Sequence, residues 1–382
     1  MVSRREFIQA VPAGALALAT GAAPGTAVAS AQAKASSLDK AVALVGDDVP
    51  TASTSLPARL QGALDTTTKA GDMYLHNGAT GRMEEAFARL LGKEDAVFMP
   101  TGTMANQVAI RILCGDRRHL LLQKESHVYR DEEDSTAILS GINPVPIEGG
   151  TGDGLIASVE AALAQRKEDP YPIEIGAISL ESPVRRLDGS CISMDVIGRI
   201  ASLAKTNGIG MHLDGARLLL MSGQPGFDPR IYAEPFDTVY VSLYKYLGAP
   251  FGAVLAGSKP QMARARQLRH IFGGTLFHGW PAALLASQGL DGFLGRFAKV
   301  RTAGDALLAK LEGMPGIRVE RVARASNIAI LHLEPRIVEG LGKRAEAANI
   351  FVAGPEDGRL PISFNETLLR RPVEAIAAVF SP

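Results

Sequence analysis

Short apolar runs alternate with longer amphipathic segments between residue 95 and about residue 258. The apolar runs are nearly continuous, which is typical of strands buried on both faces of a sheet. They predict strands at residues 96–100, 119–123, 143–148, 174–181, 208–214, 237–244 and 252–257. Amphipathic stretches between them, such as 193–208 with its terminal glycine, predict helices. The alternation predicts an α/β fold, with a mostly parallel, seven-stranded sheet covered by helices on both faces.

The pattern changes after residue 258, where helical periodicity dominates and strands become fewer. Helices are expected at 259–272, 280–294 and 297–313, and strands at 317–322, 327–334 and 360–364. This arrangement predicts a smaller C-terminal α+β domain. The chain is thus divided into a signal peptide (1–33), an N-terminal segment (34–80), a large domain (81–290) and a small domain (291–382). Within the N-terminal segment, residues 71–81 are expected to form a loop.

The N-terminus has the pattern of an export signal. Arg4 and Arg5 precede the apolar stretch 11–23, and small-residue sites follow at 27–29 and 31–33. The apolar stretch is too short to span a membrane as a helix, so no stable membrane span is expected. The paired arginines favour the twin-arginine route to the periplasm, with cleavage near Ala33. An ordinary secretory signal is the alternative.

Composition narrows the class of protein further. Hydrophobic residues make up 46% of the chain and charged residues 21%, as in a soluble globular protein. Lys+Arg and Asp+Glu both total 40, so nothing indicates a nucleic-acid partner. Cys114 and Cys191 lie in unrelated segments and are expected to be buried free thiols. No Cys/His cluster has the spacing of a zinc site, and no metal is predicted.

Polar residues of the types that bind cofactors or take part in catalysis follow several of the predicted strands. Gly102 and Thr103 lie where a strand turns into a helix, His127 follows the next strand, and Asp214 and Lys245 each end a later one. Ligands of open parallel sheets bind beyond the carboxyl ends of the strands. Each residue alone has an ordinary explanation, such as a helix cap for Asp214 or a solvent-reaching side chain for Lys245. Together they predict one site at one edge of the sheet.

This combination of residues suits pyridoxal phosphate. Backbone N–H groups at Gly102 and Thr103, with the positive end of the following helix, suit its phosphate. A carboxylate at Asp214 would keep the pyridine nitrogen protonated, and the amine of Lys245 would form a Schiff base with the aldehyde. His127 offers a flat ring that can stack on the cofactor.

The motifs "TGTMANQ", "KESHVY", "HLDGAR" and "KYLGAP", in this order, resemble the threonine aldolase and β-eliminating lyase group of fold type I pyridoxal-phosphate enzymes, which are similar to aspartate aminotransferase in fold. The resemblance covers roughly residues 70–290. It implies that Lys245 carries the cofactor, that Asp214 pairs with its pyridine nitrogen and that His127 stacks on its ring. It further implies that Arg217 contacts the phenolic oxygen.

The resemblance also implies a homodimer or homotetramer, in which residues 264–274 serve a neighbouring subunit's site. Threonine aldolases differ from this chain at 47–54, 74–82 and 273–279, and they carry an arginine for the substrate carboxylate where 360–366 has none. The cofactor machinery is therefore expected to be kept and substrate recognition to be rebuilt. Four arginines are candidates to replace the missing one, with a surface role as the alternative for each: Arg82, Arg359, Arg370 and Arg371.

The expected substrate is an amino acid, and three functions remain open. Aldol cleavage of a β-hydroxy-α-amino acid to glycine and an aldehyde comes first, with His127 or a held water as the base. In the second, a β-eliminating lyase, Lys245 removes the α-proton and a keto acid and ammonia result; the segment "SLESPVRRLDG" (179–189) favours it. Glu181 and Ser182 then lie near the cofactor, unless they only form a strand-end turn. The third is an exported protein that binds amino acids without catalysis.

Overall fold

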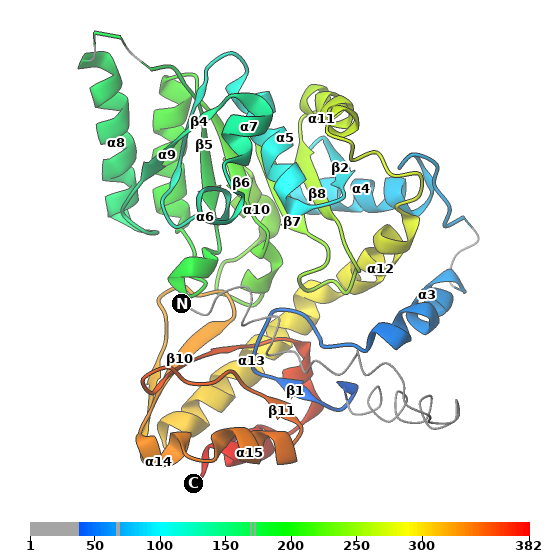
Figure 1. Ribbon diagram of the computed structural model, residues 1–382, viewed down its shortest axis with the longest axis vertical. Helices are drawn as coiled ribbons and strands as arrows, with labels where there is room; N and C mark the ends of the chain where they lie inside the picture. Colours follow the sequence, from blue (N-terminus) through cyan, green and yellow to red (C-terminus); the bar gives the residue numbers. More distant parts are fainter. Residues whose placement is uncertain (1–37, 66–68, 169, 172) are drawn as a thin grey trace, which may run out of the picture.

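The computed structural model describes residues 38–65, 69–168, 170–171 and 173–382 (Figure 1). The predicted signal peptide, residues 1–33, lies outside the described residues. In Figure 1 the cyan and green elements of the large domain lie at the top, and the orange and red elements of the C-terminal domain lie below them.

A seven-stranded sheet forms the centre of the large domain, in the order β2-β8-β7-β6-β5-β3-β4. Pairing is parallel between β3 and β4, β3 and β5, β5 and β6, and β6 and β7, whereas β8 runs antiparallel to β2 and β7. The predicted mostly parallel sheet and each of its strands are confirmed. The strands are β2 (Asp95–Met99), β3 (His119–Gln123), β4 (Asn143–Ile147), β5 (Ile175–Glu181), β6 (Gly210–Asp214), β7 (Thr238–Ser242) and β8 (Ala253–Gly257).

The helix that follows β2, α5 (Gly102–Cys114), packs against β5, β6, β7 and β8 and so runs along the middle of the sheet. Thr101 caps it, because its side chain accepts a hydrogen bond from the N–H of Met104 at 3.1 Å. The other helices of this part are α3 (Leu56–Leu64), α4 (Gly78–Leu91), α6 (His127–Asp131), α7 (Ser135–Ser140), α8 (Asp153–Glu168), α9 (Met194–Thr206), α10 (Pro229–Ala233), α11 (Lys259–Ile271) and α12 (Trp280–Leu290).

The C-terminal domain is built on α13 (Phe293–Glu312) and an antiparallel sheet in the order β12-β10-β9. The N-terminal segment joins this domain, because β1 (Val42–Ala43) pairs in parallel with β11 (Ile350–Phe351), as the blue and orange ribbons in Figure 1 show. The segment that follows β1 therefore begins at the C-terminal domain. The remaining elements are β9 (Ile317–Glu320), β10 (Ile328–Leu333), β12 (Arg359–Ser363), α14 (Pro335–Val338), α15 (Leu341–Ala347) and α16 (Val373–Ala377).

Two predicted boundaries were wrong. Residues 71–81 were expected to be a loop, but α4 begins at Gly78, because the Asp72 carboxylate accepts hydrogen bonds from Thr80 Oγ1 at 2.5 Å and from Gly279 N–H at 3.1 Å and so fixes the first turn. The helix expected at 280–294 ends at Leu290, since Gly292 adopts a φ of 63° and starts α13 four residues earlier than expected.

Cys114 and Cys191 are buried and free, as predicted. Within the described ranges no helix is long and apolar enough to cross a membrane. The same part of the chain has no group of three or more His, Cys, Asp or Glu side chains arranged to hold a metal ion.

Candidate active site

Asp214, the last residue of β6, lies at the carboxyl edge of the sheet, where the sequence placed it. Its carboxylate is buried and accepts hydrogen bonds from Asn106 Nδ2 at 3.0 Å and from the N–H of Ala216 at 3.1 Å. Both donors hold the carboxylate in one orientation. A fixed anion at this position is what a pyridinium nitrogen requires.

Asn106, on α5, connects Asp214 to the interior. Its Oδ1 lies 3.0 Å from His212 Nε2, and His212 Nδ1 lies 2.9 Å from Thr238 Oγ1. An amide oxygen can only accept, so His212 Nε2 carries the hydrogen and the Thr238 hydroxyl donates to Nδ1. Burial lowers the pKa of His212 to about 4. The neutral imidazole is therefore a fixed link between β7 and α5, not a proton donor at neutral pH.

Glu132 is a second buried carboxyl group in the same network. It accepts from Asn106 Nδ2 at 3.0 Å and from Gln107 Nε2 at 2.7 Å. Burial raises its pKa to about 7, against the effect of these amide donors, and the charge of Asp214 adds to the rise. Asn106 thus donates one amide hydrogen to each of two carboxyl groups, and the arrangement favours a single negative charge on the pair.

His127 begins α6, and both edges of its ring face carboxyl groups. Nδ1 lies 3.1 Å from Asp131 Oδ2, and Nε2 lies 3.7 Å from Glu132 Oε1. Asp131 is ionised, because the bonds from Arg186 and His127 outweigh burial and lower its pKa, so Nδ1 carries the hydrogen. Burial and the charge of Lys245 lower the pKa of His127. The ring is held by its edges, which leaves its faces for stacking.

Glu181, at the end of β5, ties two segments to this site. Its Oε2 accepts from the N–H of His127 at 2.7 Å, and its Oε1 accepts from the N–H of Arg185 at 3.0 Å. Burial and the nearby Asp214 raise the pKa of Glu181. Ser182 is different: its hydroxyl bonds to the Tyr232 hydroxyl at 2.6 Å inside the protein. Of the two side chains, only that of Glu181 bonds to another predicted site residue, and Ser182 reaches Asp214 through its backbone N–H, which donates to the Asp214 carbonyl at 3.1 Å.

Lys245 follows β7 in a loop and is half-buried. The charged groups that act on it are Arg217, Asp214, Glu181 and Asp47. Burial, and then the positive charge of Arg217, lower the pKa of its amine. A lysine with a lowered pKa supplies more of the neutral amine that reacts with aldehydes, and desolvation beside another cation is a recognised way to produce one.

Arg217 has a partner that the sequence did not reveal. Its Nε donates to Asp47 Oδ2 at 2.6 Å, and the other oxygen of Asp47 accepts from Asn327 Nδ2 at 3.2 Å. Burial opposes ionisation of Asp47, but Arg217 and Arg185 outweigh it and lower its pKa. Asp47 reaches the site because β1 anchors the N-terminal segment to the C-terminal domain. The predicted contact of Arg217 with a cofactor oxygen stays a prediction.

Gly102 opens α5, and Thr103 follows it. A Cβ atom at Gly102 would lie 2.0 Å from the Tyr240 hydroxyl oxygen, so only glycine allows the helix to start this close to β7. The positive end of α5 therefore begins beside the strand that leads to Lys245. Amine, carboxylate, flat ring and helix N-terminus are together at one sheet edge, and this set of residues fits pyridoxal phosphate.

The candidate replacements for the missing arginine have other partners. Arg359 pairs with Asp188 at 2.7 Å, and Arg82 donates to a backbone carbonyl at 2.8 Å. Arg370 and Arg371 donate to backbone carbonyls in the N-terminal segment. These contacts favour the structural role that was the alternative for each residue.

The segment 264–274 contributes arginines to its own chain. Arg266 binds Asp95 at 2.6 Å, and the buried Arg269 donates to the Phe98 carbonyl at 2.7 Å. It stays a prediction that other residues of this segment contribute to a neighbouring subunit's site.

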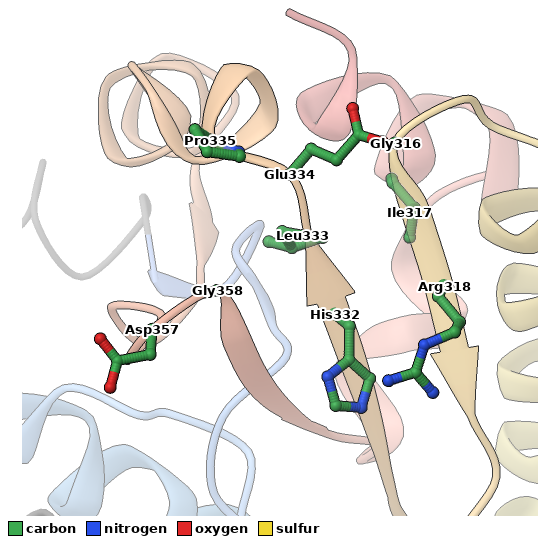
Figure 2. Close-up of a pocket in the computed structure, with 9 residues that line it drawn as sticks. All are labelled: Gly316, Ile317, Arg318, His332, Leu333, Glu334, Pro335, Asp357 and Gly358. Atoms are coloured by element: carbon green, nitrogen blue, oxygen red, sulfur yellow. The ribbon is translucent and has the colours of Figure 1, made fainter.

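A cavity of about 480 Å³ lies apart from these residues, in the C-terminal domain. Figure 2 shows Arg318 and His332 side by side on β9 and β10, with Glu334 at the end of β10. His332 Nε2 pairs with Glu320 at 2.6 Å, and Glu334 pairs with Arg336 at 2.9 Å. His332 and Glu334 are thus each paired with a residue outside the lining, and none of the predicted site residues lines the cavity.

Asn106, Glu132, His212 and Asp47 belong to the site but were missed from the sequence. One signal was available: Asn106 and Gln107 are adjacent polar residues in a helix that is otherwise apolar on its buried side. Such residues need buried partners. For Asp47 no comparable local signal exists, because its contacts are to residues far along the chain.

Comparison with known proteins finds a matching family, relatives of similar sequence and structures of similar fold. A family model described as β-eliminating lyase matches residues 44–334. Low-specificity L-threonine aldolase 1 of Arabidopsis thaliana is 28% identical over 303 residues, which cover 78% of this chain and 82% of the relative. The low specificity L-threonine aldolase of Saccharomyces cerevisiae is 30% identical, over 60% of this chain and 62% of the relative. A crystal structure from Exiguobacterium, described as an aromatic amino acid β-eliminating lyase/threonine aldolase, superposes with a TM-score of 0.76 at 25% identity and covers 91% of this chain and 97% of that one.

Proposed function

The chain belongs to the β-eliminating lyase family, and we propose that it is a pyridoxal-phosphate-dependent lyase that cleaves a β-hydroxy-α-amino acid of the threonine type to glycine and an aldehyde. The observation that carries the proposal is Lys245, a half-buried amine of lowered pKa within the field of Asp214 at the sheet edge. Threonine aldolases among the relatives favour aldol cleavage over the other reactions of the family.

Five residues would hold the cofactor: Lys245 its aldehyde, Asp214 its pyridine nitrogen, His127 the face of its ring, and Gly102 and Thr103 its phosphate. When bound, pyridoxal phosphate supplies the electron sink for the bond that breaks at the α-carbon of the amino acid. The protein's part is to keep these groups in place. Asp214 does so as an anion fixed by two donors.

Proton transfer is assigned to His127. Its Nδ1 hydrogen is directed at Asp131, so its Nε2 carries the lone pair, and the 3.7 Å to Glu132 is longer than a hydrogen bond. A lowered pKa keeps the ring neutral at neutral pH. His127 Nε2, or a water molecule held by it, therefore accepts the proton of the substrate's β-hydroxyl group as the carbon–carbon bond opens.

The same residues permit β-elimination if the substrate is held differently. In that case Lys245 takes the α-proton and a β-substituent leaves. Orientation at the α-carbon, not a different set of groups, separates the two reactions. The products distinguish them: glycine and acetaldehyde from threonine by aldol cleavage, and a keto acid and ammonia by elimination.

The test compares the wild type, Lys245→Ala and Lys124→Ala, each incubated with pyridoxal phosphate. Lys124 is a surface lysine paired with Glu148, so its loss should leave the site intact. We expect a visible absorption band that borohydride bleaches in the wild type and in Lys124→Ala, and no such band in Lys245→Ala. Threonine and allo-threonine should then yield glycine and acetaldehyde. A wild type that takes up no cofactor, or that releases a keto acid and ammonia instead, would contradict the proposal.

We further propose that the protein is exported to the periplasm by the twin-arginine route and acts as a homodimer or homotetramer. Arg4 and Arg5 before an apolar stretch support export. Assembly is supported by an exposed aromatic pair, Tyr74 and Phe277, whose rings lie 5.2 Å apart edge to face. N-terminal sequencing of the secreted protein and its mass in solution test these two points.

A further inference from the structure

The first two backbone N–H groups of α5 are available to a ligand, and the inference drawn from them rests on the proposed function and its cofactor. The N–H of Met104 is used by the Thr101 cap, and the N–H of Ala105 bonds to the Thr101 carbonyl. Within the described ranges, the N–H groups of Gly102 and Thr103 donate to no protein acceptor. Free N–H groups at the positive end of a helix suit a phosphate.

Tyr240, in the middle of β7, brings a hydroxyl group to this helix end. A Cβ atom at Gly102 would lie 2.0 Å from the Tyr240 hydroxyl oxygen and 2.6 Å from the ring carbon that carries it, so the hydroxyl lies against the first residue of α5. The side chain is only 1% exposed. Its hydroxyl nevertheless forms no hydrogen bond to the part of the chain that the structure describes, whereas buried hydroxyl groups normally have a partner.

The surroundings of Tyr240 keep its hydroxyl a donor without satisfying it. Burial, and then the negative charge of Asp214, which is its partner residue across β6 and β7, raise the pKa of Tyr240 well above its usual value. Ser242 opposes this rise, but its buried Oγ has no hydrogen-bond partner among the described residues, so its contact with Tyr240 is too loose for a hydrogen bond. The phenol therefore keeps its hydrogen at neutral pH and can donate it to a ligand.

We propose that the Tyr240 hydroxyl donates a hydrogen bond to the phosphate of pyridoxal phosphate, together with the N–H groups of Gly102 and Thr103. A phosphate has several acceptor oxygens, so it can accept from all three donors at once. Strand β7 then serves the cofactor twice, through Tyr240 for its phosphate and through Lys245, which follows the strand, for its aldehyde. The close contact between Gly102 and Tyr240 keeps the hydroxyl and the helix N–H groups in one place.

The experiment compares the wild type, Tyr240→Phe and Tyr171→Phe. The control makes the same chemical change on a side chain that is 90% exposed. Each protein is loaded with pyridoxal phosphate or with pyridoxal, which has the ring and the aldehyde but no phosphate. The dissociation constants are obtained from the loss of the visible absorption band on dilution. Urea unfolding of the cofactor-free proteins shows whether the hydroxyl also has a role in folding.

We expect Tyr240→Phe to weaken the binding of pyridoxal phosphate about ten- to hundredfold, which is the effect of losing one hydrogen bond to a charged acceptor. Binding of pyridoxal should change less than about twofold. The free energy of unfolding should not fall, because the lost hydroxyl leaves no protein group without its partner. Tyr171→Phe should match the wild type in all three measurements.

Three results would overturn the assignment of Tyr240 and leave the proposed function intact. In Tyr240→Phe these are an unchanged affinity for pyridoxal phosphate, an equal weakening of both ligands, and a loss of stability in the cofactor-free protein. The last would show that the hydroxyl has a partner inside the protein. A wild type that binds neither ligand would overturn the proposed function, and the assignment with it.

Discussion

The two sides of the candidate site are built in different ways. The cofactor floor is a buried network on α5, β6, β7 and the residue that follows α6, formed by Asn106, Glu132, His212, Asp214 and Thr238. The substrate rim is a set of charged residues from the N-terminal segment, the turn after β5, the segment after β6 and the strand β12, formed by Asp47, Arg185, Asp188, Arg217 and Arg359.

The two sides differ in whether their side chains can change hydrogen-bond or ion-pair partners. In the floor, each of these contacts joins one donor to one acceptor, and the side chains are buried, so solvent does not compete for them. Such a network fixes the direction of the Asp214 carboxylate. In the rim, guanidinium and carboxylate groups can change partners, and Asp188 and Arg359 remain 37% and 42% exposed. The floor suits a permanent cofactor, and the rim suits a substrate that enters and leaves.

The comparison predicts that the largest loss of stability comes from the floor. Asn106→Leu has nearly the same volume but removes the donor of two carboxyl groups and the acceptor of His212. Because these buried partners lose their hydrogen bonds, we expect the free energy of unfolding to fall by about 4 kcal/mol. Urea unfolding measures it, and the affinity for pyridoxal phosphate should fall as well.

Asn143→Leu is the matched control, since Asn143 is exposed on β4 and the chemical change is the same. It should alter the unfolding free energy by less than about 0.5 kcal/mol. A loss below about 1 kcal/mol in Asn106→Leu would mean that the floor is not held by this network.

A smaller and pH-dependent effect is expected from Glu132→Gln. The pKa of Glu132 is raised from 4.5 to about 7 in the folded protein, so the unfolded chain loses this proton first as the pH rises. The contribution of Glu132 to the stability of the wild type is therefore full below pH 4.5 and decreases between pH 4.5 and about 7, by up to about 3 kcal/mol. Glutamine cannot ionise, so the variant should become the more stable protein as the pH increases from 5 to 8.

The substitution can be accommodated, because the Oε1 atom of Gln107 has no hydrogen-bond partner in the described structure. A rotated Gln107 amide can accept from the new side-chain amide at position 132. The measurement is the difference in unfolding free energy between the two proteins, without cofactor, at several pH values. A difference that stays constant with pH would show that Glu132 has an ordinary pKa.

The two sides also differ in how far the sequence revealed them. His127, Asp214 and Lys245 were predicted because each follows an apolar strand, and strand ends of a parallel sheet meet at one edge. Asn106 and His212 were missed because their partners depend on how α5 rotates against β6. That rotation is decided by packing, which periodicity alone does not determine.

The rim was less accessible to prediction. Asp47 meets Arg217 only because β1 pairs with β11, more than 300 residues along the chain. Arg359 was named as a possible carboxylate ligand from its residue type, yet β12 turns it toward Asp188. Ion pairs between such distant segments leave no periodic or local signal, so the sequence could supply candidates for the rim but not their partners.

The smallest effect is expected from Arg359→Gln, at the outer part of the rim. The pair with Asp188 is about 40% exposed on both sides, so its loss should change the unfolding free energy by less than about 1 kcal/mol. The freed Asp188 lies three residues from Arg185 and acts on its charge. It should therefore attract the Arg185 guanidinium and offset part of the lost pair, which keeps the change in stability small; urea unfolding measures it. A loss of stability as large as that of Asn106→Leu would show that the rim is as rigid as the floor. Because Asp188→Asn removes the same partly exposed pair from its other side, it should lose as little stability as Arg359→Gln.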